Sequence, residues 1–357
     1  MPGAYREDYA ARIAEEISMQ YQEAELALKE DIARKLAKGL DESDWAIQKE
    51  IQIASIRRKA ELEVKKLDRG IESLSGEMEG AYRAGANGTE IKVEGDFLST
   101  NIEAIRALAA EKITLIRSAH FQILRRTIDA YRDAVSEAVS LSTSGVYTRR
   151  QGAMKAMDDL VGRGFGHFVD KKGRAWSLQS YVEMATRTGV SNAMLQGRLD
   201  AYQAAGYDLV IISDAPEECS ICRPWEGRIL SISGDDKKHA SLDSARAAGL
   251  FHPNCRHNAT RWIKGLTKPL YNTKTADPEG NQLRQQQRYL ERQVRAKKER
   301  VAVKEAWLEE DKGNPEAQAV LFRAKQQLSA ARSKLDSFII ENDRKRLRYR
   351  EQIKSAI

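Results

Sequence analysis

Residues 101–142 read NIEAIRALAAEKITLIRSAHFQILRRTIDAYRDAVSEAVSLS, and large apolar side chains recur in this stretch mostly at helical spacing. The recurring positions are Ile102, Ile105, Leu108, Ile113, Ile116, Phe121, Leu124, Ile128, Tyr131, Val135 and Val139. This period is typical of an α-helix that buries one face. At 1.5 Å per residue an unbroken helix here would extend about 60 Å. We therefore expect one long central helix over residues 96–144.

The regions on both sides of this stretch are also predicted to be helical. Residues 1–95 show the same period, with a break at Gly39–Trp45, and predict a helical hairpin. Six glycines between residues 70 and 95 are expected to interrupt the second helix. Residues 271–357 are highly charged, and Gly313-Asn314-Pro315 divides them into a second helical hairpin.

Residues 145–270 have a different character, with more glycine, more aromatic residues and short apolar runs. Residues 207–213 and 228–233 are candidate strands, and helices are expected over 149–161 and 178–205. The predicted fold class is thus mainly α with a small α+β module. Long helical hairpins at the two ends flank a compact central domain that contains cysteine and histidine.

The composition limits the classes of protein to consider. The chain has 357 residues, of which 41% are hydrophobic and 31% charged, with a formal net charge of +7. It has no run of about 18 apolar residues and no apolar signal core at its start, so neither a membrane span nor a signal peptide is expected. Three cysteines in this length do not form a disulfide framework, which favours assembly in a reducing cytoplasm.

All three cysteines lie between Asp214 and Arg261. Cys219 and Cys222 form a Cys-x-x-Cys pair, and Cys255 follows in the block His252-Pro-Asn-Cys-Arg-His257. Two cysteines separated by two residues can bind one metal ion from a tight turn, and a second pair of ligands can complete a tetrahedron. Any four of Cys219, Cys222, His252, Cys255 and His257 are therefore candidate ligands of a structural zinc ion.

Three other interpretations of this block stay open at this point. The first is a metal-free cluster of buried thiols and hydrogen-bonded histidines. The second is a thiol–disulfide pair, which Pro224 and Gly227 disfavour because a redox-active pair would open a helix. The third is a catalytic zinc or nuclease site. The sequence has no His-x-Glu before the pair, no His-Glu-x-x-His and no phosphate-binding glycine loop, so we do not expect an enzyme.

Several motifs in this region resemble a known family. They are Asp214-Ala-Pro before the Cys-x-x-Cys pair, Pro224-Trp-Glu-Gly227, and the stretch Leu242–His257, which ends in His-Pro-Asn-Cys-Arg-His. Residues 177–193 and the basic helix after Asn272 extend the likeness over roughly the C-terminal two thirds of the chain. Together they resemble the phage minor capsid proteins of the Mu F-like head morphogenesis and minor capsid protein 2 families.

The resemblance implies a structural protein of a tailed bacteriophage, present in few copies in the virion. It implies a role in procapsid assembly close to the portal vertex, with the portal protein and capsid or scaffold proteins as partners. Long amphipathic helices also allow coiled-coil contacts and a homo-oligomer. The alternative from another class is a zinc-dependent protein that binds or cleaves nucleic acid. An injected effector and a cellular coiled-coil scaffold are less consistent with the sequence.

Basic residues supply the candidate contacts with packaged DNA or with protein partners. Arg256 and Arg261 flank the cysteine and histidine block, where pairing with Asp214, Glu217 or Glu218 is the simpler interpretation. The strongest basic run lies near the end of the chain and contains Arg344, Lys345, Arg346, Arg348 and Arg350. Such a run can bind phosphates, although a solvated helix end is the simpler interpretation.

Overall fold

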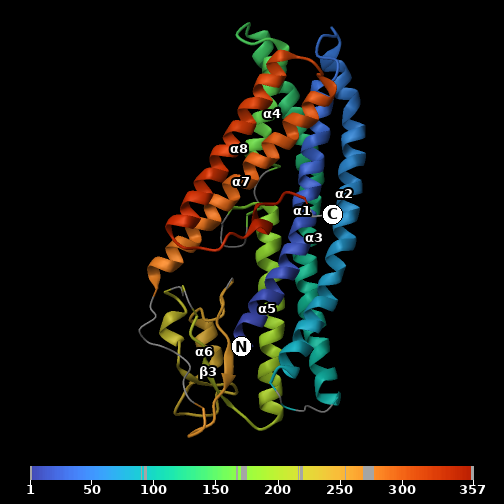
Figure 1. Cartoon of the computed structure of the whole chain (residues 1–357). Coiled ribbons are helices and arrows are strands. Elements are labelled where there is room, and N and C mark those ends of the chain that lie inside the picture. Colours follow the sequence, from blue (N-terminus) through green and yellow to red (C-terminus); the bar gives the residue numbers. More distant parts are fainter. Residues whose placement is uncertain are drawn as a thin grey trace. The chain divides into compact units, whose positions relative to one another are not determined.

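The computed structural model describes residues 2–89, 91, 95–165, 168–169, 175–215, 217, 220–253, 255–267 and 277–354; for 2–8, 95–100, 121, 168–169 and 175 it describes the backbone alone. The described residues form eight α-helices and six short strands (Figure 1). None of these helices combines the length and hydrophobicity that crossing a membrane requires. The fold is mainly α with a small α+β module, as the sequence predicts.

Contacts divide the chain into two compact units made of discontinuous segments. Unit 1 comprises residues 1–18, 71–116 and 180–284, and unit 2 comprises residues 19–70, 117–179 and 285–357. The helices α1 (Pro2–Ala37), α2 (Trp45–Asn87) and α3 (Gly95–Thr143) each pass from one unit into the other. The division of the chain into four consecutive domains, which we expect from the sequence, therefore stays a prediction.

Unit 2 is a helical body. It contains the parts of α1, α2 and α3 that belong to unit 2, together with α4 (Arg149–Arg163), most of α7 (Pro278–Glu310) and α8 (Pro315–Glu341). Leu28, Ile32 and Leu36 of α1 are fully buried in one apolar cluster with Trp307 of α7. A short antiparallel pair, β1 (Phe168–Val169) and β2 (Ala175–Trp176), also belongs to this unit. The apolar period of the sequence thus marks the buried faces over most of these helices, as amphipathic helices require, although Leu108 and Val139 of α3 are exposed.

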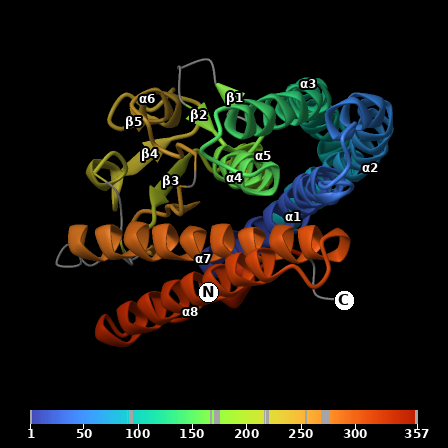
Figure 2. The ribbon, with the colours of Figure 1, turned by 90° about the horizontal axis from the view of Figure 1, so that it is seen from above.

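The C-terminal hairpin forms where the sequence predicts it. In both views α7 and α8 run side by side (Figures 1 and 2). Asn314 caps α8, because its side chain accepts hydrogen bonds from the backbone N–H groups of Glu316 and Ala317, each at 3.0 Å. After α8 the chain is not an α-helix: residues 344–347 are irregular and a 3-10 turn, η2, follows (Arg348–Glu351). The basic run is thus no helix end, which corrects that interpretation.

Unit 1 holds the small sheet, which lies beside the long helix α5 (Leu178–Ala204). The strand order is β5 (Ala240–Ser241), β4 (Ile229–Ser231), β3 (Leu209–Ile212) and β6 (Ala259–Arg261). β3 pairs antiparallel with β4 and β6, and β4 pairs parallel with β5. The helix α6 (Leu242–Ala247) and residues of α5 share an apolar cluster with the sheet.

The glycines between residues 70 and 87 do not interrupt α2, and this part of the sequence prediction was wrong. Within unit 1, a Cβ atom on Gly85 would lie 1.9 Å from the Met194 carbonyl oxygen of α5. A Cβ atom on Gly197 of α5 would lie 2.0 Å from the Tyr82 carbonyl oxygen of α2. These two glycines have no side chain because α2 and α5 approach each other backbone to backbone, and not because the helix ends there.

Candidate metal centre

The sheet of unit 1 brings together the two halves of the cysteine and histidine pattern. One half lies in the loop from β3 to β4, and the other lies in the loop from α6 to β6. The two loops are tied to each other where β3 ends. The Ser213 N–H donates to the Asn258 carbonyl at 2.8 Å, and the Asn258 N–H donates to the Ser213 hydroxyl oxygen at 2.9 Å. Residues more than 30 positions apart in the chain therefore become neighbours.

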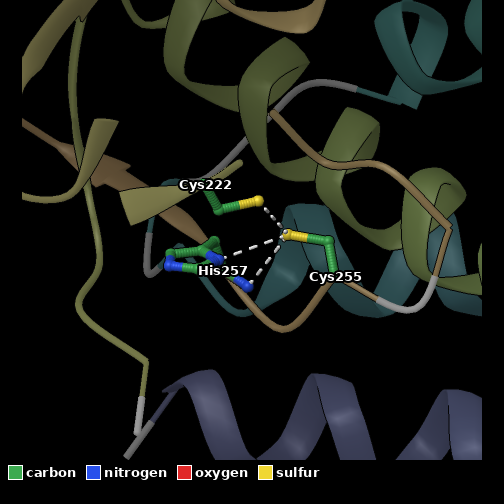
Figure 3. A group of neighbouring side chains, drawn as sticks. All are labelled: Cys222, Cys255 and His257. Carbon is green, nitrogen blue, oxygen red and sulfur yellow. Dashed lines mark hydrogen bonds between the residues drawn. The ribbon is translucent and has the colours of Figure 1, made fainter. Parts of the chain in front are cut away.

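Three of the predicted ligands meet at this point (Figure 3). The Sγ atoms of Cys222 and Cys255 are 3.6 Å apart, and the Cys255 Sγ atom is 3.3 Å from Nδ1 of His257. One ligand atom from each of the three residues lies within 4.8 Å of the other two. Cys222 and His257 are buried, and Cys255 is partly buried. Both cysteines are free thiols.

Local structure sets the direction of each ligand. Cys222 precedes the 3-10 turn η1 (Arg223–Trp225), and its carbonyl accepts a hydrogen bond from the Trp225 N–H at 2.9 Å. The Cys255 N–H donates to the His252 carbonyl at 2.9 Å, and the His257 N–H points at the Cys255 sulfur at 3.4 Å. Pro224 within η1 restricts the backbone beside Cys222.

A carboxylate that we did not predict completes the arrangement. Nε2 of His257 lies 2.6 Å from Oε1 of Glu226, and the Glu226 side chain is 10% exposed. A histidine that binds a metal ion through one ring nitrogen commonly donates the other N–H to a carboxylate. Glu226 belongs to the Pro-Trp-Glu-Gly motif, which lies between the two halves of the cysteine and histidine block. This position was the only signal in the sequence that Glu226 lies near the centre.

The electrostatics favour a thiolate at this centre. The hydrogen bond from Cys222, together with the hydrogen bond and charge of His257, holds the pKa of the Cys255 thiol well below its usual range, against the effect of burial. Burial alone would lower the pKa of His257, but its interactions with Cys255 and then Glu226 outweigh burial and raise that pKa. Thiolate is the form of cysteine that binds metal ions.

The distances fit a shared metal ion. In a tetrahedral zinc site with Zn–S near 2.3 Å and Zn–N near 2.0 Å, two sulfur ligands are about 3.8 Å apart, and a sulfur and a nitrogen ligand are about 3.5 Å apart. The two distances from Cys255 Sγ, 3.6 Å to sulfur and 3.3 Å to nitrogen, are each within about 0.2 Å of these values. A metal-free hydrogen-bonded cluster has similar distances. The arrangement of these three ligand atoms can therefore hold a metal ion.

Of the two remaining predicted ligands, only His252 is among the described residues. Cys219 lies outside the described residues. His252 is not among the three residues whose ligand atoms meet, since its Nδ1 lies 2.8 Å from the Pro253 carbonyl oxygen. However, His252 and Cys255 line the same small pocket together with residues of α5. Cys219 and His252 thus stay candidates for the fourth ligand.

The predicted contact residues of this region are engaged within unit 1. Arg256 donates to the Glu217 carbonyl at 3.3 Å, and its guanidinium lies 3.7 Å from the Glu217 carboxylate. Arg261 lies over the ring of Tyr207, 4.6 Å from the ring centroid. Local pairing thus accounts for the position of both arginines, and their contact with DNA or a partner stays a prediction.

The comparison with known families agrees with the resemblance found in the motifs. The model of the family described as Phage minor capsid protein 2 matches residues 6–340. The chain belongs to this family. The matched residues include most of the long helices and both loops that contain the cysteines and histidines of this phage minor capsid protein 2 family member. The relation to the Mu F-like group stays a prediction.

A relative among known proteins also supports the family. A protein of Lactococcus phage LL-H described as "Structural protein" is 26% identical over 182 residues, which are 48% of this chain and 49% of the relative. The chain thus matches about half the length of that relative. No solved structure matches the chain significantly. Both descriptions name structural components of phages, and the chain is therefore a phage minor capsid protein.

Proposed function

We propose that this minor capsid protein acts in procapsid assembly close to the portal vertex, with the portal protein and capsid or scaffold proteins as partners. The family match over residues 6–340 carries the proposal. The helices α1, α2 and α3 contain 36, 43 and 49 residues and provide long surfaces for contacts with other chains. Packaged DNA is the further partner, and the virion is the proposed location.

The test is to locate the protein in assembled heads. Heads purified after co-expression with the portal and major capsid proteins of the same phage would be labelled with an antibody and imaged by electron microscopy. We expect label at a single vertex and only a few copies per head by quantitative mass spectrometry. Label on all vertices, or absence from the heads, would show that the proposed location is wrong.

We further propose that the centre of Cys222, Cys255 and His257 holds a structural zinc ion, with Cys219 or His252 as the fourth ligand. The supporting observation is the Glu226 carboxylate on the far nitrogen of His257, which is where a metal-binding histidine needs its partner. Four protein ligands would leave no open position for catalysis. The ion would tie the two loops to the sheet.

Elemental analysis of the purified chain tests this proposal. We expect about one zinc per chain, and loss of both zinc and thermal stability in Cys255→Ser. His239→Gln is the matched control, because this histidine belongs to the same unit but not to the centre. Metal-free protein with an unchanged melting temperature in Cys255→Ser would contradict the proposal. DNA cleavage that a chelator abolishes would favour the alternative of a zinc-dependent nuclease.

A further inference from the structure

The positive charge of the chain is concentrated in its last segment. Residues 277–354 contain 19 lysines and arginines against 13 aspartates and glutamates, whereas the whole chain has 59 against 52. Six of the seven excess positive charges therefore lie in the hairpin of α7 and α8 and in the tail that follows it. An excess of this kind on one part of the surface attracts polyanions.

Hydrogen bonds hold the tail against α7 within unit 2. Gln287 of α7 donates to the Lys345 carbonyl at 3.0 Å and accepts a hydrogen bond from Arg344 at 2.7 Å. Further along, Lys297 of α7 donates to Gln327 of α8 at 2.9 Å. Cations from α7, from α8 and from the tail are thus part of one body.

Three carboxylates of this region, on Glu291, Asp336 and Glu351, are already paired with arginines. Arg346 binds both carboxylate oxygens of Glu351, each at 2.7 Å, and also contacts Asp336. Arg350 lies 3.8 Å from the buried carboxylate of Glu291. Arg346 and Arg350, two residues of the predicted basic run, therefore stabilise the tail and have little charge left for a ligand.

Five cations of α7, α8 and the tail have no hydrogen bond or ion pair from their side chains within the described part of the chain. They are Arg292 and Lys298 of α7, Arg332 of α8, and Lys345 and Arg348 of the tail. All except Lys298 are exposed. Burial and the positive charges of Arg332 and Arg346 lower the pKa of Lys298, against the effect of Glu351. Burial is the largest cause of this pKa shift, and the charges of Arg332 and Arg346 add to it.

We propose that these five residues, the free cation set, form a surface that binds the phosphate backbone of double-stranded DNA without reading its sequence. Arginine binds phosphate through a planar fork of N–H donors, and exposed cations without carboxylate partners keep their full charge for the ligand. The inference rests on the proposed function in one respect, namely that the DNA would be the packaged genome. It differs from the basic run predicted from the sequence, because Arg292, Lys298 and Arg332 take the place of Arg344, Arg346 and Arg350.

The experiment measures binding of a fluorescent 30-base-pair duplex to the full chain by anisotropy at several salt concentrations. If all five cations bind phosphates, the slope of log K against log salt is about −4.5, since each phosphate contributes about 0.9. The double variant Arg292→Gln/Arg332→Gln should reduce that slope by about two. Arg57→Gln/Arg58→Gln is the matched control, because these exposed arginines of α2 lie in the same unit and the charge change is equal.

Either of two results would overturn the inference. One is a control variant that reduces the slope as much as the test variant does, which would mean that overall charge alone drives binding. The other is a chain that ignores the duplex but binds polyglutamate at the same salt, which would assign the surface to an acidic protein. Incorporation of the double variant into heads, measured in parallel, separates this question from the proposed function. Wild-type chain that binds DNA but stays out of heads would contradict only the proposed function.

Discussion

The contact between α2 and α5 leads to a sharp prediction for Gly85→Ala. The added Cβ atom would lie 1.9 Å from the Met194 carbonyl oxygen and 2.8 Å from the carbonyl carbon. Real Cβ contacts are essentially never closer than 3.0 Å. The two helices would have to separate by about 1 Å at this point, because the obstacle is backbone and cannot rotate away. The same close approach occurs at Gly197.

The expected loss of stability follows from two opposing effects. Overpacking of a tightly packed contact costs about 1–3 kcal/mol, with the upper part of the range expected here. Replacing glycine by alanine inside a helix recovers about 1 kcal/mol. The net destabilisation should be about 2 kcal/mol, which lowers the melting temperature of a unit of 150–250 residues by about 4–8 °C.

Gly76→Ala is the control, because this glycine lies in the same helix and the same unit and a Cβ atom there would meet nothing within 4 Å. It should gain about 0.5–1 kcal/mol from helix propensity. Scanning calorimetry and urea unfolding of both variants would measure the difference. If Gly85→Ala melts at or above the wild-type temperature, the backbone contact between α2 and α5 is not as close as described.

Three further predictions concern other parts of the molecule. Burial lowers the pKa of His120 in spite of its 2.7 Å contact with Asp68. The unfolded chain therefore binds the proton more readily, and the free energy of unfolding should fall as the pH drops below about 6.5. The urea midpoint would be measured at several pH values in wild type and in His120→Gln, and the same pH dependence in both would contradict this. Asn314→Ala removes the cap of α8 and should cost about 1 kcal/mol in urea unfolding, whereas no change would mean that the cap is dispensable. Glu226→Gln should weaken zinc binding about 10–100-fold in a competition titration with a chromogenic chelator, and unchanged affinity would argue against its role beside His257.

Much of the fold was predictable because local signals determine it. The apolar period places the helices. The tripeptide Gly313-Asn314-Pro315 marks the turn between α7 and α8, and its Asn314 caps α8. The strands β3 and β4 lie inside the runs predicted from their apolar residues. The cysteine and histidine block likewise carries its ligand types at recognisable spacing. These features depend on neighbours within a few positions, which the sequence displays directly.

Other features depend on residues that are distant in the chain. Gly85 reads as an interruption until α5 is seen against it, because only the neighbouring backbone shows why a side chain is excluded. Glu226 stands out only through its contact with His257, 31 positions away in the chain. The basic run reads as uniform, yet Arg346 is neutralised by carboxylates and Arg348 is not. The sequence by itself thus determined the helices and the chemical types of the site, whereas tertiary packing decided which groups meet, because contact and charge neutralisation act through space.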